Sequence, residues 1–333
     1  KFTRILAIDG GGIRGIIPAQ ILVVLEQKLQ QKTRNPEARL ADFFDLIAGT
    51  STGGLLAGFY LAPHPQDPSR PRYTTADALE VYLNRGGEIF DISLWHKISS
   101  LGGMVDEKYP APPLEAALRD YFQDVRLRQL IRPCLIPAYD IEQRKAVFFN
   151  SMDARSDENR DFLVRDVLRA ATAAPMYFEV SELPASSGET VPLVDGGVFC
   201  SNPAMCAYAE VRNRFRKHPT AKKMVLLSLG TGRMQHPWPA AKARHWGQME
   251  WSKPLFDIFM SAVEETVDFQ VRQIFHSVGR ESQYLRINEP LKYASPELDN
   301  VSPENLDRLR REGQETAERS SDLMDEWIRW LLK

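Results

Sequence analysis

DLIAGTSTGGLLAG, residues 45–58, places a serine between an apolar strand pattern and an apolar helix pattern. Gly49 and Gly53 flank Ser51 in a G-x-S-x-G arrangement. This context is typical of a nucleophile elbow, a sharp strand-to-helix turn that exposes the serine hydroxyl at the carboxyl end of a sheet. The alternative is a glycine-rich turn in which Ser51 only caps the helix. The strand and helix on either side favour the elbow, so Ser51 is the candidate nucleophile of an α/β protein.

A second glycine loop precedes this one, in LAIDGGGIRGIIPAQIL at residues 6–22. Its glycines at 10, 12 and 15 match the G-x-G-x-x-G pattern of dinucleotide-binding folds. That interpretation also requires a second strand that ends in an acidic residue. Residues 26–44 are instead polar and helical in character. The sequence therefore disfavours a dinucleotide site.

The same loop offers what a serine nucleophile needs to stabilise an oxyanion. We expect the backbone amides of Gly10, Gly11 and Gly12 to point into the site with no side chain in the way, ahead of a helix that contributes its positive end. Arg14 adds a positive charge nearby, as support for the substrate or the oxyanion. Its alternative role is an ordinary salt bridge with Asp9 or another carboxylate.

A serine also needs a base, and Asp195 is the candidate. It ends an apolar strand pattern in VPLVDGGVFCSNPA, residues 191–204, and two glycines follow it. A carboxylate with an ordinary pKa of about 4 is a weak base toward a hydroxyl, so we expect apolar surroundings to raise the pKa of Asp195. The alternative is a triad that includes a histidine after Asp195. None of the histidines follows a strand pattern beside a turn motif; they are His64, His96, His218, His236, His245 and His276.

Short apolar runs alternate with longer helical patterns along the chain, which is typical of an α/β sheet covered on both faces. Strands are expected at residues 4–8, 45–48, 134–139, 146–149, 191–194, 224–229 and 284–287. Helices are expected at residues 18–31, 54–61, 75–85, 113–122, 162–171, 203–215, 254–276 and 303–332. We expect one domain over residues 1–333, with irregular surface loops inserted near 62–73 and 233–254.

The composition disfavours several classes of protein. The 333 residues are 43% hydrophobic and carry a net charge of −2, without the broad basic face that nucleic-acid binding needs. No apolar run approaches the roughly 20 residues of a membrane-spanning helix, and the N-terminus does not resemble a signal peptide. Three cysteines without metal-ligand spacing fit a reducing compartment. We therefore expect a cytoplasmic protein that uses no metal or other cofactor.

Three motifs, taken together, resemble those of the patatin-like phospholipases. They are DGGGIRG at 9–15, GTSTGG at 49–54 and DGG at 195–197, in that order. RDVLRAATAAPMYF at 165–178, LLSLGTG at 226–232 and YLRI at 284–287 also look like family segments, so the resemblance extends over most of the chain. It implies a three-layer α/β/α fold with a mostly parallel central sheet.

The resemblance also implies a serine hydrolase that cleaves acyl esters of membrane phospholipids without a histidine. Ser51 would be the nucleophile, Asp195 its base, and Gly10, Gly11 and Gly12 the oxyanion loop. Some bacterial members act as toxic effectors that cyclic nucleotides switch on, so a cyclic dinucleotide activator is among the expected partners. The alternatives are a serine esterase with a Ser-Asp-His triad and a non-catalytic module that binds lipid or nucleotide.

Two segments combine tryptophan with apolar or basic residues. The first is SDLMDEWIRWLLK at 321–333, where a helical stripe predicts packing on the core. Its members are Leu323, Met324, Trp327, Ile328, Leu331 and Leu332. The second is residues 233–253, where tryptophans among basic residues favour a lipid interface and predict peripheral contact with the inner membrane surface. Its alternative is a packed loop with buried tryptophans; the residues concerned are Trp238, Trp246, Trp251, Lys242, Arg244 and Lys253.

Overall fold

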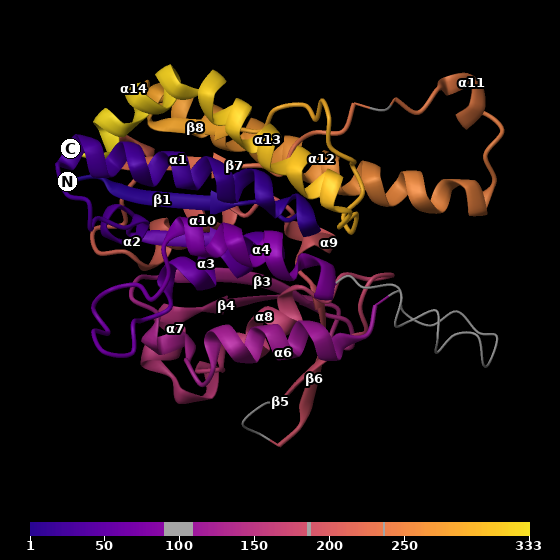
Figure 1. Cartoon of the computed structure of the whole chain (residues 1–333), viewed down its shortest axis with the longest axis horizontal. Helices are drawn as coiled ribbons and strands as arrows, with labels where there is room; N and C mark the ends of the chain where they lie inside the picture. The colour runs from indigo at the N-terminus through magenta and orange to yellow at the C-terminus, as the bar shows by residue number, and fades with distance from the viewer. Residues whose placement is uncertain (90–108, 185–187, 236) are drawn as a thin grey trace.

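A central sheet of eight strands carries helices on both faces (Figure 1). The computed structural model describes residues 1–89, 109–184, 188–235 and 237–333. The strands are ordered β5-β6-β3-β2-β1-β7-β8 across the sheet, and β4 pairs with β3. Their bounds are β1 Thr3–Ile8, β2 Leu46–Gly49, β3 Cys134–Asp140, β4 Lys145–Asn150, β5 Ser181–Pro184, β6 Thr190–Asp195, β7 Met224–Leu229 and β8 Tyr284–Ile287.

The middle of the sheet is parallel. β1 pairs in parallel with β2 and β7, β2 with β3, and β7 with β8, whereas β4, β5 and β6 join in antiparallel pairs. Ile8, the last residue of β1, is level with Gly49 of β2 and Leu229 of β7. Because these carboxyl ends are level, the loops that follow the three strands meet at one edge of the sheet, where α/β proteins place their sites.

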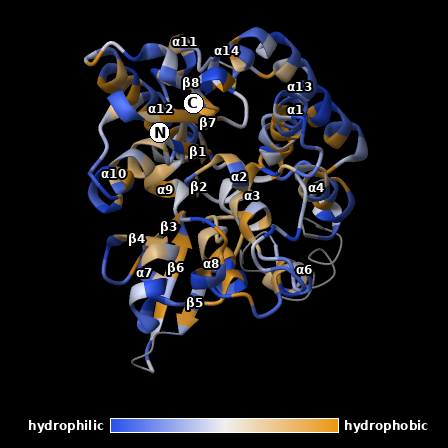
Figure 2. Ribbon diagram, turned by 90° about the vertical axis from the view of Figure 1, so that its left-hand side faces the viewer, coloured by the Kyte–Doolittle hydropathy of each residue, from blue (hydrophilic) through white to orange (hydrophobic). Residues whose placement is uncertain are grey.

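Side chains of β1 alternate between two separate cores, as expected of a strand with helices on both faces. Leu6 and Ile8 belong to the larger core, and Ile5 and Ala7 belong to the smaller one. Figure 2 shows the apolar strands between helices whose outer surfaces are largely polar. The predicted three-layer α/β/α fold with a mostly parallel sheet is confirmed.

The helices of the larger core include α1 (Ile16–Thr33), α3 (Thr52–Leu61) and α8 (Val164–Ala171). Those of the smaller core are α10 (Ala204–Arg214) and α12 (Gln248–His276). The remaining α-helices of the described residues are α2 Leu40–Phe43, α4 Thr75–Ile89, α6 Ala111–Phe122, α7 Ser151–Ser156, α9 Gly197–Cys200, α11 Ala240–Ala243, α13 Pro303–Arg319 and α14 Ser321–Leu331.

Every predicted strand is present, with its ends displaced by one residue at most. β5 was not predicted; it has four residues, lies at the edge of the sheet and ends in Pro184. Its place follows from antiparallel pairing with β6, in which Ser181 lies opposite Leu193. A strand this short contains too few residues for an alternating pattern to stand out.

Two expectations about helices were wrong. Residues 303–332 form two helices rather than one, because the chain turns at Ser320 between α13 and α14. Residues 233–254 are not irregular throughout, since α12 begins at Gln248 and includes Pro254. Proline favours the first turn of a helix, which led to the prediction of a start at Pro254. The observed start lies earlier, where the Glu250 carboxylate accepts the Gly247 N–H at 3.0 Å.

Candidate active site

Ser51 lies on the sharp turn that joins β2 to α3. Its φ of 53° and ψ of −119° are unusual for a residue with a side chain, and such strain is typical of a nucleophile elbow. Gly53 permits the turn, because a Cβ there would lie 2.2 Å from the Ile8 carbonyl oxygen. A Cβ on Gly49 would lie 2.0 Å from the Gly53 carbonyl oxygen. The G-x-S-x-G spacing is therefore a packing requirement of this turn.

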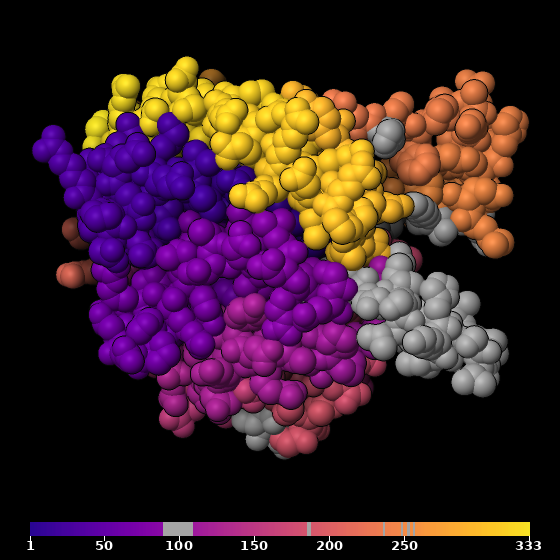
Figure 3. Space-filling model, in the orientation of Figure 1, coloured from indigo at the N-terminus to yellow at the C-terminus, as the bar shows by residue number. Residues whose placement is uncertain are grey.

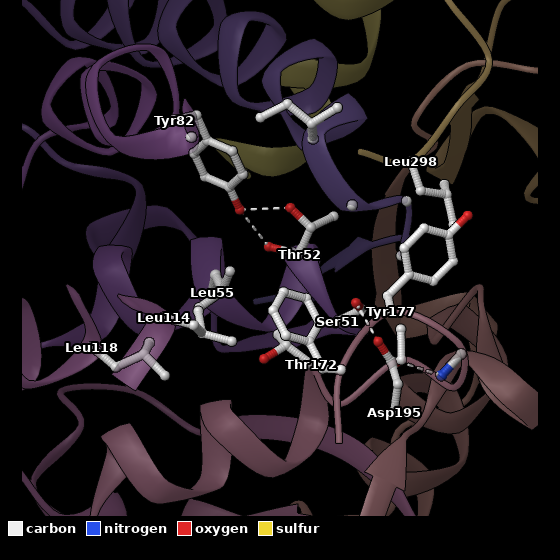
Figure 4. Close-up of a pocket in the computed structure, with 18 of the residues that line it drawn as sticks. Ser51, Thr52, Leu55, Tyr82, Leu114, Leu118, Thr172, Tyr177, Asp195 and Leu298 are labelled. Atoms are coloured by element: carbon white, nitrogen blue, oxygen red, sulfur yellow. Dashed lines mark hydrogen bonds between the residues drawn. The ribbon is translucent and has the colours of Figure 1, made fainter. Parts of the chain in front are cut away.

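Asp195 lies within hydrogen-bond distance of Ser51. Asp195 is the last residue of β6, and its Oδ2 accepts the Ser51 hydroxyl at 2.5 Å (Figure 4). Its other oxygen, Oδ1, accepts the Gly197 N–H at 2.7 Å. The glycine turn after the strand thus holds one carboxylate oxygen in place while the other faces the serine. The structure brings together the two residues that the sequence singled out as nucleophile and base.

Burial changes the basicity of Asp195. Only 4% of the residue is exposed, and this desolvation raises the pKa of its carboxyl to about 6, although the hydrogen bonds from Ser51 and Gly197 act in the opposite direction. The expected rise of this pKa is confirmed. A carboxylate with a pKa of about 6 is a stronger base than an ordinary aspartate and is still ionised at neutral pH.

The glycine loop after β1 faces the same site, but not with all three expected amides. The Gly10 N–H already donates to the Ser201 carbonyl at 2.9 Å, which corrects the expectation that it serves an oxyanion. Among the described residues, the N–H groups of Gly11 and Gly12 have no hydrogen-bond partner. Gly12 has a φ of 56°, and a Cβ there would lie 2.2 Å from the Leu298 carbonyl oxygen. Two backbone donors therefore remain for a developing negative charge.

Arg14 lies elsewhere than expected. Its guanidinium donates to the Gly232 carbonyl at 3.3 Å and lines a neighbouring polar cavity rather than the one that contains Ser51. Its expected salt bridge with Asp9 is also absent, because Asp9 pairs with Arg286. Among the described residues, Arg14 forms no ion pair with a carboxylate, and its guanidinium Nε has no partner. A role of Arg14 in supporting the substrate or the oxyanion stays a prediction.

The Asp9–Arg286 pair was missed by the sequence analysis. Arg286 of β8 donates through Nη1 to Asp9 Oδ1 at 2.9 Å and through Nη2 to Asp9 Oδ2 at 2.5 Å. It also donates to the Ser228 hydroxyl at 2.9 Å. A bidentate pair of this kind fixes the carboxylate immediately before the glycine loop. An acid at the end of β1 and an arginine in the YLRI segment were the available signals, but nothing in the sequence paired them.

A second positioning contact involves Tyr82 of α4. Its hydroxyl donates to the Thr52 carbonyl at 2.9 Å and lies 2.6 Å from the Thr52 hydroxyl (Figure 4). Thr52 directly follows Ser51 and begins α3. The contact therefore holds the first turn of that helix, and with it the nucleophile.

Ser51, Asp195, Gly11 and Gly12 line one cavity of about 1090 Å³, including its open mouth. The rest of its wall is almost entirely apolar. α3, α4 and α6 contribute Leu55, Phe59, Val81, Leu114, Leu118 and Phe122. An apolar cavity with polar groups at one place suits a substrate with a long hydrocarbon portion and a single reactive group.

The described histidines lie outside this cavity. His276 pairs with Glu281 at 2.8 Å, and His218 lies 3.0 Å from the Arg212 carbonyl. His64 and His245 line no part of the cavity wall either. His96 and His236 lie outside the described residues. None of the four described histidines therefore completes the alternative Ser-Asp-His triad.

The described part of the chain contains neither a candidate membrane span nor a candidate metal site. No helix there is both long enough and apolar enough to cross a membrane. No group of three or more His, Cys, Asp or Glu side chains there is arranged to hold a metal ion. The expected cyclic dinucleotide activator stays a prediction, because no contact among these residues tests it.

Comparison with known proteins agrees with the motifs. The family model described as patatin-like phospholipase matches residues 6–208. Patatin-like protein 2 of Oryza sativa subsp. indica is 33% identical, over 98% of this chain and 86% of that protein. Patatin-like protein 2 of Arabidopsis thaliana is 34% identical, over 95% of this chain and 83% of that protein.

The chain is also similar to a protein that is named as inactive and to one solved structure. A Solanum tuberosum protein named probable inactive patatin-3-Kuras 1 is 31% identical over 96% of this chain and 87% of its own length. The match to the crystal structure of VipD from Legionella pneumophila covers 97% of this chain and 67% of that chain, with a TM-score of 0.39 and 12% identity. From the family model and the relatives above 30% identity, we conclude that this chain belongs to the patatin-like phospholipase family.

Proposed function

We propose that this protein is a serine hydrolase that cleaves acyl esters of membrane phospholipids through a Ser51–Asp195 dyad. Family membership supports lipid acyl hydrolysis in general. The single observation that carries the finer proposal is the 2.5 Å contact between Ser51 and Asp195 beside an apolar cavity. The apolar wall of this cavity suits an acyl chain, and Ser51 and Asp195 line the same cavity.

Acylation begins when Ser51 Oγ attacks the ester carbonyl carbon while Asp195 Oδ2 accepts the hydroxyl proton. The carbonyl oxygen becomes an oxyanion, and the N–H groups of Gly11 and Gly12 stabilise it. The intermediate then collapses with cleavage of the bond to the leaving oxygen. Asp195 returns its proton to that oxygen, so a lysophospholipid leaves and the acyl group remains on Ser51.

Deacylation repeats the same proton transfers with water. A water molecule attacks the acyl carbon while Asp195 accepts its proton, and the same two amides stabilise the second oxyanion. Collapse breaks the bond to Ser51 Oγ, which takes the proton back from Asp195. The fatty acid is released and the free dyad is restored. Neither half of the cycle requires a histidine.

The test compares the wild type with Ser51→Ala on mixed phospholipid vesicles and on a short-chain soluble ester. We expect the wild type to release fatty acid and lysophospholipid, identified by lipid mass spectrometry, and Ser51→Ala to release neither. Ser156→Ala, a serine change on α7 outside the cavity, is the matched control and should keep full activity. Equal activity of Ser51→Ala and the wild type would refute the dyad, and inactivity of both would favour a non-catalytic binding module.

A further inference from the structure

An arm projects from the body of the molecule at one side of the sheet. It consists of residues 237–259, which include α11 and the first turns of α12 (Figures 1 and 3). Figure 1 shows β1 running from the N-terminus toward the side on which α11 lies. The parallel strands β2 and β7 run the same way, so the arm projects on the side where these strands end and where Ser51 precedes α3.

The arm carries a cluster of three tryptophans. The ring centres of Trp238 and Trp246 are 5.5 Å apart, and those of Trp246 and Trp251 are 5.1 Å apart, both in edge-to-face geometry. Despite this packing, Trp238 is 44% exposed and Trp251 is 37% exposed. The cluster is therefore ordered by its own contacts while presenting large aromatic surfaces to its surroundings.

An exposed apolar stripe continues from this cluster along α12. Trp251, Leu255 and Phe259 follow one another at intervals of four residues, which places them on one face of a helix. Leu255 is 41% exposed and Phe259 is 59% exposed. Ile258 adds a further exposed side chain beside the stripe. Isolated exposed apolar residues are common, but a contiguous stripe on a projecting helix marks an interaction surface.

The helix that carries the stripe reaches the catalytic cavity. Met260, the next residue after Phe259, lines the cavity that contains Ser51 and Asp195. From Trp251 to Met260 the rise along α12 is about 14 Å at about 1.5 Å per residue. One hydrocarbon leaflet of a bilayer is about 15 Å thick, half of the whole core. A lipid held at the level of the tryptophans is therefore about one acyl-chain length from the cavity.

Basic side chains lie beside the aromatic cluster. Lys242 of α11 and Arg244 directly after it are both exposed. An exposed acid of the arm, Glu250, has one carboxylate oxygen engaged by the Gly247 N–H. Tryptophan together with lysine and arginine is characteristic of segments that sit at the boundary between lipid headgroups and acyl chains.

We propose that the arm docks onto the surface of an anionic phospholipid bilayer and presents the mouth of the Ser51 cavity to it. The inference rests on the proposed function, because it treats the bilayer as the source of the substrate. The tryptophans and the apolar stripe enter the interface, and Lys242 and Arg244 lie against anionic headgroups. A second copy of this chain is the other occupant that an apolar stripe fits, and the experiment below separates the two.

The test uses binding to vesicles by the full chain in a Ser51→Ala background, so that catalysis does not enter the measurement. On vesicles of phosphatidylcholine and phosphatidylglycerol, Trp238→Ala/Trp251→Ala should weaken binding about tenfold or more. Lys242→Gln and Arg244→Gln should each weaken it roughly fivefold, and only when phosphatidylglycerol is present. Trp330→Ala is the matched control, because Trp330 lies on α14, away from the arm, where it packs edge-on against Phe2. It should bind as the parent does.

A second measurement separates docking from catalysis and from folding. With Ser51 intact, the arm variants should hydrolyse a short-chain soluble ester at the wild-type rate and vesicle lipid more slowly. Vesicle binding that is unchanged in the double tryptophan variant would overturn the proposal. The proposal would also be overturned if light scattering showed that the parent protein is a dimer without lipid and that the double tryptophan variant is a monomer. The surface would then bind a second copy of the chain. Vesicle binding that needs the arm, in a protein with no esterase activity, would support docking while refuting the proposed function.

Discussion

Asp9 and Asp195 occupy equivalent places in the chain and do different things. Each stands at the carboxyl end of a strand, and glycines follow each, three after Asp9 and two after Asp195. Each is buried, and burial raises the pKa of each carboxyl to about 6. Asp9 is held by the Arg286 guanidinium, whereas Asp195 contacts a hydroxyl and a backbone amide.

The difference between the two turns lies in their partners. The cation beside Asp9 favours its ionised form and ties it to β8, so this carboxylate positions the glycine loop. The carboxylate of Asp195 has no such cation among its described contacts, so accepting a proton relieves an unfavourable buried charge. One strand-end motif thus yields a structural ion pair in the first turn and a base in the second.

The largest expected effect that would distinguish the role of Asp195 from that of Asp9 is on kcat. Asp195→Asn should lower kcat by about 10⁴-fold, because the amide cannot accept the Ser51 proton. Asp9→Asn keeps the Ser51–Asp195 contact and should cost far less in kcat per folded molecule. Hydrolysis of a soluble ester, with the folded fraction measured by circular dichroism, gives the comparison. Similar kcat values for the two variants would show that the roles assigned here are not distinct.

The next largest effect is on stability. Arg286→Met removes the cation from a buried pair and leaves Asp9 uncompensated, a change that typically costs about 3–5 kcal/mol. Urea unfolding at pH 8 measures the loss. It should be smaller at pH 5, because protonation of Asp9 then removes the stranded charge. An Arg286→Met protein as stable as the wild type at pH 8 would mean that the pair contributes nothing to holding the first turn.

The glycine loop gives a third comparison. Gly12→Ala should lower kcat by about 10²- to 10³-fold, the usual effect of losing one oxyanion donor, because its positive φ and the Leu298 carbonyl leave no room for a methyl group. Gly87→Ala is the control, since a Cβ there meets nothing within 4 Å. Both variants are assayed with a soluble ester. Normal turnover by Gly12→Ala would remove the Gly12 amide from the mechanism.

The contrast between the two turns also explains which residues of the site could be predicted from the sequence. Ser51 and Asp195 sit in local motifs whose turns require glycine at fixed spacings, so their positions could be predicted. The parallel strands were equally accessible, because each is a short apolar run. Arg286 was not, since it lies 277 residues from Asp9 and only the pairing of β8 beside β7 brings it close.

Other features were not predicted for the same reason, because they depend on contacts between distant segments of the chain. Gly10 carries no sign in the sequence that its amide is engaged by Ser201, a contact between segments far apart in the chain. The helices α14 and α12 show that helical periodicity by itself does not predict whether an apolar stripe is buried. Met324, Trp327, Ile328 and Leu331 of α14 pack on the core as predicted, although Leu323 and Leu332 of the same expected stripe are exposed. A comparable stripe on α12 lies mostly outside any core.

The smallest expected effect is on the free energy of unfolding at pH 8, which Asp195→Asn and Asp9→Asn should change in opposite directions. The folded-state pKa of Asp195 is about 6, above the unfolded value of about 4, so the folded protein binds the proton more tightly. Its free energy of unfolding should therefore decrease as the pH rises from about 4 to about 6, by at most about 3 kcal/mol for this group. Asp195→Asn removes that charge and should be more stable than the wild type at pH 8, with the gain vanishing near pH 4. Asp9→Asn should instead be less stable than the wild type at pH 8, because it leaves the Arg286 guanidinium without its bidentate partner. Urea unfolding of the wild type and the two variants between pH 4 and pH 8 measures both changes. A loss of stability at pH 8 in both variants would contradict the prediction. It would show that Asp195, like Asp9, is held by favourable contacts that outweigh the cost of its burial.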